Sequence, residues 1–231
     1  MSTPSLSVAV CLYPLVTALD YQGPVEFLAA LTASAKPFIL KEHSTGFEDT
    51  YDSIPTLGPL TYLAPSNEPT GPGISGEAGP RVIPDKTYAE ATEQFDILLV
   101  PGGFNPGPPE LLDFLTRQVP GAKYVLTVCT GSWILAKTGA LDGKRATGNK
   151  FLFKKMQADT EGRGIQWVAR ARWVEDGKFW TSSGVTAGMD MAYAFVTHIA
   201  GEPVAKAIAA VIELRARDQE DDEFAVVHGL V

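Results

Sequence analysis

Apolar residues along this chain form short continuous runs that alternate with stretches of helical period. The continuous runs are too apolar for a half-exposed sheet and predict strands covered on both faces, at "LSVAVCLY", "FDILLVPGG" and "AKYVLTV". Apolar positions spaced three or four residues apart predict helices at "GPVEFLAALTASA", "PPELLDFLTRQV" and "TGSWILAKTG". This alternation predicts an α/β fold with a doubly wound, mainly parallel sheet and helices on both faces.

The remaining segments carry weaker patterns. We expect a second strand at "KPFILKEHS", an extended hairpin-like arm at "PTLGPLTYLAP", and helices at "TYAEATEQ" and "FLFKKMQAD". The pair Asp176-Gly177 in "ARWVEDGKFWTSSG" predicts a hairpin turn. Two further helices, "AGMDMAYAFVTHIAG" and "PVAKAIAAVIELRAR", are expected to complete the core.

Nothing in the pattern divides the chain into separate units. We find no internal repeat and no linker, so residues 1–231 are expected to form a single domain. The segment 65–84 is rich in Gly, Pro and Ser and predicts a long surface excursion. The acidic tail at 217–231 is expected to lie on the surface.

Composition narrows the class of protein. The formal net charge is -8 and no Lys/Arg cluster offers a footprint for phosphates, so no nucleic-acid partner is expected. The first apolar stretch has no basic flank and is interrupted by Pro14 and Asp20, so we expect no membrane association and a cytoplasmic location. Two cysteines far apart and three scattered histidines predict free thiols and no metal site.

Three strand ends carry residues suited to chemistry, in "TALDYQGP", "PGGFNPG" and "CTGS". In a doubly wound sheet all three would face one crevice. Cys129 stands between a strand and a helix, where free N–H groups and the helix dipole would stabilise a thiolate. A buried thiol that only fills space fits the same position, and the spacing alone leaves both interpretations open. Cys11 lies inside an apolar run and is expected in the core.

The other two strand ends offer a backbone donor and a carboxyl group. In "VPGGF" the glycines would let the backbone approach a ligand, and Gly103 is the N–H donor we favour, although a plain tight turn explains the pair as well. Asp20 would have a raised pKa if desolvated and could then move a proton beside Cys129; helix capping is the alternative. His43, His198 and His228 give no readable Cys–His pair.

Together these motifs resemble the ThiJ/PfpI superfamily, whose flavodoxin-like fold holds a cysteine at a strained strand-to-helix turn, the nucleophile elbow. The resemblance is carried, in the family's order, by "FDILLVPGG", "VCTGSWILAKTGALDGKRAT" and "SSGVTAGMDMA". Within it, "LDYQGPVEFL" is similar to the isocyanide hydratase branch. The resemblance implies that Cys129 is the nucleophile, Asp20 the general acid and base, and Thr130 the threonine that follows the nucleophile. It also implies a homodimer and no cofactor.

The implied reaction adds water to a small electrophile, an isocyanide, through a thioimidate on Cys129, with charge stabilised by N–H groups near Gly103 and Thr130. Two alternatives use the same thiol: a cofactor-independent glyoxalase that converts methylglyoxal to lactate, and a redox-responsive stress protein in which Cys129 is oxidised. Protease-like relatives carry histidine after the cysteine, where Thr130 stands here.

One departure from the hydratase pattern concerns the pocket. Asn149, in "GNK", stands where a histidine often follows "GKRAT" in that branch. Phe104, Trp133 and Val185 are further candidates for the pocket lining by their position in the chain, with core packing as an equally open role.

Overall fold

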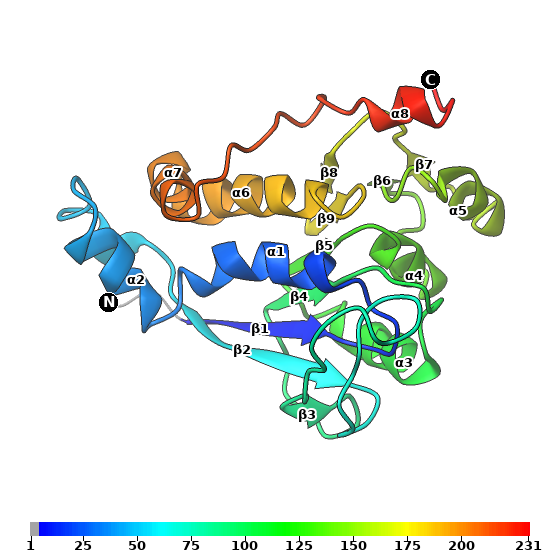
Figure 1. The fold of residues 1–231 in the computed structure, drawn as a ribbon, viewed down its shortest axis with the longest axis horizontal. Coiled ribbons are helices and arrows are strands. Elements are labelled where there is room, and N and C mark those ends of the chain that lie inside the picture. Colours follow the sequence, from blue (N-terminus) through cyan, green and yellow to red (C-terminus); the bar gives the residue numbers. More distant parts are fainter. Residues whose placement is uncertain (1–4) are drawn as a thin grey trace.

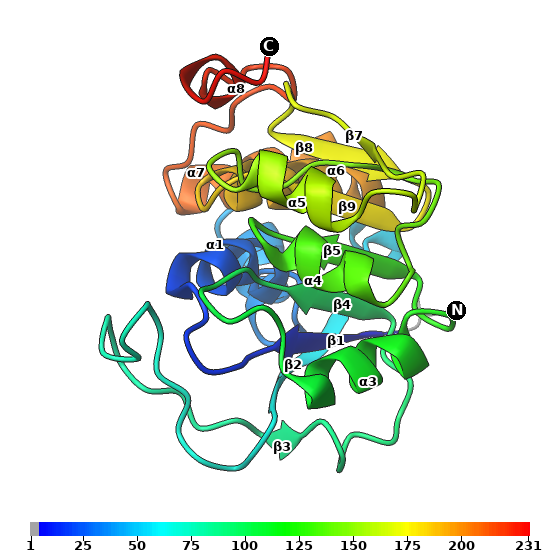
Figure 2. The same cartoon turned by 90° about the vertical axis from the view of Figure 1, so that its right-hand side faces the viewer.

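A seven-stranded sheet in the order β3-β2-β1-β4-β5-β9-β8 forms the centre of the computed structural model, which describes residues 5–231 (Figures 1 and 2). Neighbouring strands are parallel except for the hairpin pair β8 and β9. Their bounds are β1 Leu6–Cys11, β2 Leu57–Ala64, β3 Lys86–Thr87, β4 Ile97–Val100, β5 Tyr124–Thr127, β8 Trp173–Asp176 and β9 Phe179–Ser182. Two short strands, β6 Arg145–Ala146 and β7 Gln166–Trp167, pair separately.

Helices cover both faces of this sheet. On one face α1 packs on α6, which packs on α7; α3 and α4 lie together on the other face (Figures 1 and 2). Their bounds are α1 Ala18–Ala29, α3 Pro109–Gln118, α4 Gly131–Lys137, α5 Phe153–Asp159, α6 Ala187–Ala200, α7 Glu202–Val211 and α8 Phe224–Val227. The expected doubly wound, flavodoxin-like α/β fold is confirmed. The central strands β4 and β5 are buried nearly throughout, which is why their sequences are continuously apolar.

Three expected elements were wrong in type. The segment "KPFILKEHS" is helical, as α2 Ala35–Pro37 followed by a π-helical turn at Phe38–Glu42. The reason is one-sided burial: Ile39 and Leu40 are buried while Phe38 is 53% exposed, so the run never had two covered faces. The position beside β1 is taken by β2, which is therefore a parallel strand of the main sheet and not a hairpin arm.

The segment "TYAEATEQ" also differs from expectation, because only Thr87 belongs to the short strand β3 and the residues after it form turns and irregular structure instead of a helix. Its Tyr88 side chain is buried and its hydroxyl donates to Leu12 O at 2.7 Å, which anchors the segment to the end of β1. A tertiary contact therefore outweighs the helical tendency of this stretch.

Helix α1 starts earlier than the sequence suggested. It begins at Ala18 and contains Pro24, although the Gly-Pro pair predicted a start at Gly23. Asp20 therefore lies in the first turn of α1, where its side chain is buried.

The two segments expected on the surface behave differently. Residues 65–84 contain one isolated bridge, Thr70 with Val82, and are largely exposed. The tail at 217–231 does not lie freely on the surface, because Asp222 and Ala225 are buried and the tail ends in helix α8. A buried lysine, Lys150, pairs with Asp222, a contact that a charge pattern cannot reveal. Within residues 5–231 no helix has the length and apolarity needed to cross a membrane.

Gly131 lies where α4 meets the sheet, and a Cβ at this position would stand 2.1 Å from Val100 O, a backbone atom of β4. We expect Gly131→Ala to lower the free energy of unfolding by about 2 kcal/mol or more, because helix and strand must separate. Urea unfolding measures this. Gly58→Ala is the matched control, since its Cβ would meet nothing closer than 3.5 Å; equal losses in the two variants would contradict the prediction.

Candidate active site

Four neighbouring strands, β1, β4, β5 and β9, place the functional residues at one edge of the sheet. Asp20 follows β1 at the start of α1, Gly102 and Gly103 follow β4, Cys129 follows β5, and Ser183 follows β9. Since these strands are parallel neighbours, their carboxyl ends meet. The three strand ends selected from the sequence are therefore brought together.

The backbone of Cys129 is held in a left-handed conformation, with φ of +61°. Its N–H donates to the carbonyls of Ser182 and Ser183, at 3.2 and 2.9 Å, and its own carbonyl accepts the Asn149 N–H at 3.2 Å. A non-glycine residue in this region costs on the order of 1 kcal/mol or more, so the surrounding hydrogen bonds must impose it. This is the strained strand-to-helix turn that the resemblance implied.

Three groups surround the Cys129 sulfur: the Asn149 side chain, the Thr130 backbone N–H and the Asp20 carboxyl. The Asn149 Nδ2 donates to Sγ at 3.1 Å. Burial raises the pKa of the Cys129 thiol well above its usual range, and the negative charge of Asp20 raises it further; the Thr130 N–H and the Asn149 amide act in the opposite direction. Cys129 is only 7% exposed, and this burial opposes the thiolate that the helix start favours.

Asp20 is fully buried beside that thiol. Its Oδ2 accepts the Gly102 N–H at 2.9 Å, while Oδ1 accepts no regular hydrogen bond from the described residues. Burial raises the pKa of Asp20 to about 7, although the Gly102 N–H and the Cys129 thiol both favour the ionised form. Near neutral pH this carboxyl is therefore present in both forms and can take or return a proton.

Thr130 connects the cysteine turn to the glycine pair. Its hydroxyl accepts the Gly103 N–H at 2.9 Å and donates to Gly103 O at 3.2 Å. The Gly103 N–H, the donor favoured from sequence, is thus occupied by Thr130, and the Gly102 N–H by Asp20. A Cβ at Gly102 would lie 2.6 Å from Thr130 N and Oγ1, so this close approach requires glycine.

A cavity of about 210 Å³ adjoins the site on the side of Asn149. Asn149 and Val185, both selected from sequence, line it together with Phe151, Phe224 and His228. The last two belong to the C-terminal segment, which sequence reasoning placed outside the site.

The other two pocket candidates lie elsewhere. Phe104 is 59% exposed, and the Trp133 ring has the amines of Lys137 and Lys155 at 5.6 and 5.4 Å from its centroid. Neither lines the cavity beside Asn149. A larger hollow of about 800 Å³ over β8, β9, α6 and α7 contains none of the residues around the thiol, so we do not associate it with this chemistry.

No histidine contacts the thiol among the described residues. His198 packs against the rings of Tyr124 and Trp180, and His43 against Phe38. Over residues 5–231, no group of three or more His, Cys, Asp or Glu side chains is arranged to hold a metal ion. Cys11 is a free, fully buried thiol in β1, as expected.

Sequence reasoning missed two buried ion pairs next to the cavity. Lys150 Nζ lies 3.2 Å from Asp222 Oδ2, and the Arg172 guanidinium lies 2.5 Å from Asp190 Oδ2. Each pair joins residues far apart in the chain, so no local pattern marks them. The only available signal was the charge itself, in segments otherwise typical of a surface.

Comparisons with known proteins indicate the family and the fold. A model of the DJ-1/PfpI family matches residues 53–198, which include Cys129 but not Asp20. The isonitrile hydratase of Pseudomonas putida is 28% identical over 213 residues, or 90% of this chain and 78% of that protein. A ThiJ/PfpI family protein from Pseudomonas syringae superposes with a TM-score of 0.73 and 24% identity, covering 94% of this chain and 78% of that one. DJ-1beta of Drosophila melanogaster superposes with a TM-score of 0.69 and 19% identity, covering 92% of this chain and 100% of that one.

The burial of Asp20 leads to a prediction about how the free energy of unfolding depends on pH. Its folded pKa of about 7 lies above the ordinary 3.8, so its contribution to stability is present below pH 4 and is lost as pH rises through 7. Asp20→Asn removes this loss, and we expect its stability advantage over the parent to grow by about 2–3 kcal/mol between pH 5 and pH 8. Urea unfolding at both pH values measures it. Asp113→Asn, on an exposed position of α3, is the control; an advantage of Asp20→Asn that does not change with pH would contradict the prediction.

Proposed function

We propose that this chain, which belongs to the DJ-1/PfpI family, is an isocyanide hydratase-like enzyme that converts an isocyanide and water to an N-substituted formamide. The observation that carries the proposal is the buried Asp20 carboxyl facing the Cys129 thiol, with a pKa of about 7 and no histidine in contact with the sulfur among the described residues. The similarity to an isonitrile hydratase over 90% of the chain supports the same reaction.

In the first step, ionised Asp20 takes the thiol proton while Cys129 Sγ attacks the terminal carbon of R–N≡C. A carbon–sulfur bond forms and the triple bond becomes a double bond. The electron pair left on carbon then takes the proton from Asp20, which gives the thioimidate R–N=CH–S and restores the carboxylate. The Asn149 amide and the Thr130 N–H stabilise negative charge on sulfur as the proton leaves.

In the second step, water adds to the thioimidate carbon. Asp20 takes a proton from the water, the oxygen bonds to carbon, and the imine nitrogen receives the proton. The tetrahedral species R–NH–CH(OH)–S then collapses: the carbon–sulfur bond breaks, R–NH–CHO leaves, and the hydroxyl proton returns through Asp20 to sulfur. The sum is R–NC plus H₂O giving R–NH–CHO, with no redox change and no cofactor in any step.

The two alternative functions fit this environment less well. Peroxide oxidation needs an accessible thiolate, whereas burial raises the pKa of the Cys129 thiol and leaves the residue only 7% exposed. Glyoxalase-like relatives use a glutamate beside the cysteine, where the resemblance places Asp20. The homodimer implied by the resemblance and the cytoplasmic location expected from the sequence both stay predictions. Methylglyoxal is the comparison substrate for the glyoxalase alternative.

The decisive assay measures formamide production from benzyl isocyanide. We expect turnover by the parent, a loss of at least about a thousandfold in Cys129→Ala, and a loss of about a hundredfold or more in Asp20→Asn, because the first removes the nucleophile and the second the proton acceptor. Cys11→Ala is the matched control, since that thiol is buried in β1. Formamide production that survives Cys129→Ala, or lactate from methylglyoxal as the faster product, would contradict the proposal.

The pH dependence follows from Asp20. Only its ionised form can take the thiol proton, so kcat/KM should rise about tenfold per pH unit below pH 6 and level off above pH 8, with a midpoint near 7. A pH series with benzyl isocyanide measures it. The residual activity of Asp20→Asn should lack this rise; a midpoint near 4 in the parent would show that another group controls the reaction.

A further inference from the structure

The C-terminal segment, residues 217–231, returns to the candidate site after helix α7. Figure 1 shows the chain leaving α7, running past α6 and ending in α8. Two residues of this segment, Phe224 and His228, form one side of the cavity next to Asn149. The segment is therefore part of the wall of the cavity that adjoins the thiol.

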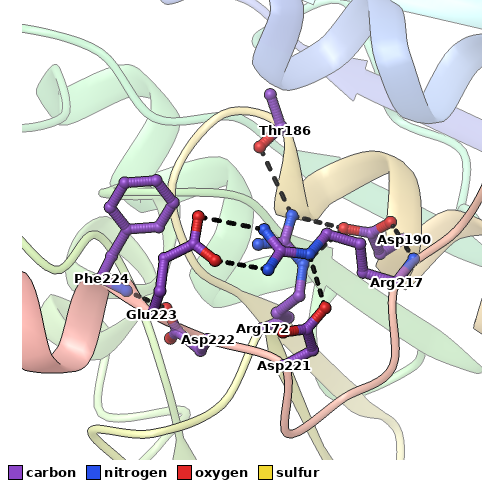
Figure 3. A network of polar contacts seen from close by, with 8 residues as sticks. All are labelled: Arg172, Thr186, Asp190, Arg217, Asp221, Asp222, Glu223 and Phe224. Carbon is purple, nitrogen blue, oxygen red and sulfur yellow. Dashed lines mark hydrogen bonds and ion pairs between the residues drawn. The ribbon is translucent and has the colours of Figure 1, made fainter.

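One anchor of the segment is the buried pair of Arg172 and Asp190 (Figure 3). The Arg172 Nε donates to Asp190 Oδ2 at 2.6 Å, and Asp190 Oδ1 accepts the Arg217 backbone N–H at 2.9 Å. The Arg172 backbone N–H donates to Gln219 O at 2.7 Å. Each member of the pair thus binds the core and the C-terminal segment at once.

The second anchor is Lys150 with Asp222, whose side chains are 2% and 1% exposed. The Lys150 amine also donates to Thr147 Oγ1 at 2.6 Å and to Ala171 O at 3.0 Å, while Asp222 Oδ1 accepts the Phe224 N–H at 3.0 Å. A buried charge without its partner is strongly unfavourable, so this pair fixes where the segment sits more than it adds stability. Asp222 thereby sets the start of α8 and the position of Phe224.

The cavity that results is suited to a neutral apolar group. Phe151, Val185, Ala187 and Phe224 contribute its apolar lining. Lys150 and Arg172 also line it, but each is already paired with a carboxylate, so neither cation is free to attract an anion. Its volume of about 210 Å³ is sufficient for one aromatic ring, since an apolar cavity of about 150 Å³ holds benzene.

We propose that the C-terminal segment is the specificity wall of a subsite that receives the substrate's apolar substituent, an aryl or branched alkyl group, and that Phe224 is the specificity-determining residue. Asn149 joins the two parts of the site: its side chain lines the cavity and its Nδ2 donates to Cys129 Sγ. A substrate whose reacting carbon lies at the sulfur would extend its substituent past Asn149 toward Phe224. This inference rests on the proposed function, because it assigns the substrate class of that same thiol.

The test measures binding without chemistry. In a Cys129→Ala background, the dissociation constants of N-benzylformamide and N-methylformamide are determined by calorimetry or ligand-observed NMR. We expect N-benzylformamide to bind at least about tenfold more tightly, because its ring is buried in the cavity. Phe224→Ala should reduce that preference to less than about threefold. Val226→Ala is the matched control, since Val226 is 61% exposed on the same helix and does not line the cavity; it should keep the full preference.

A second variant tests the anchor and leaves the wall residue in place. Asp222→Asn removes the charge that pairs with Lys150. It should therefore raise the dissociation constant of N-benzylformamide by about fivefold or more and change that of N-methylformamide by less than twofold. Asp221→Asn is its control, because Asp221 pairs with Arg217 at the surface and is 56% exposed. Thermal unfolding of each variant establishes that the chain is folded at the assay temperature.

The outcomes separate this inference from the proposed reaction. A parent preference below threefold, no binding of either formamide, or a preference that persists in both Phe224→Ala and Asp222→Asn would overturn the specificity wall, even if the enzyme hydrates isocyanides. If the protein shows the expected binding pattern but produces no formamide from benzyl isocyanide, the subsite is supported and the proposed hydratase activity is contradicted.

Discussion

A carboxyl group buried against a thiol is the interaction on which the rest of this structure depends. Both Asp20 and Cys129 are buried away from solvent, so burial raises the pKa of each group, and the charge of Asp20 raises the pKa of the thiol further. This arrangement lowers stability at neutral pH and needs backbone strain at Cys129, whose φ is +61°. The extensive apolar sheet and its two helical layers supply the stability that such a site requires.

Much of the fold and part of the site could be predicted from the sequence, because a parallel sheet covered on both faces imposes a recognisable pattern. Strands β1, β4 and β5 appear as continuous apolar runs, and the residues that follow them must meet at one edge. The helical turn at Phe38–Glu42 escaped prediction because a short apolar run does not report whether one face or two are covered. The strand β2 escaped because its half-exposed pattern resembles a surface arm.

The raised pKa of Cys129 and the buried contacts of the C-terminal segment could not be predicted, and for a shared reason. A strand-to-helix turn suggests a thiolate from local geometry, but burial by distant elements reverses that tendency at Cys129. Likewise, an acidic tail suggests a solvated surface, whereas Asp222 is buried because Lys150 lies opposite it. Both depend on which segments far apart in sequence come together, and neither has a signature within a window of neighbouring residues.

The position of Asn149 explains how the two parts of the site act together. The resemblance places a histidine there in the hydratase branch, and an imidazole could both give and take a proton. The Asn149 Nδ2 group that faces the sulfur is a donor and is not basic, so in this chain the hydrogen bond to Cys129 Sγ can stabilise negative charge but cannot remove the thiol proton. In the proposed reaction, proton transfer at the sulfur then depends on Asp20 alone, which leaves the Asn149 side free for recognition. A neutral substrate suits this division of roles, because a charged one would alter the pKa of the single group that has to exchange protons at every step.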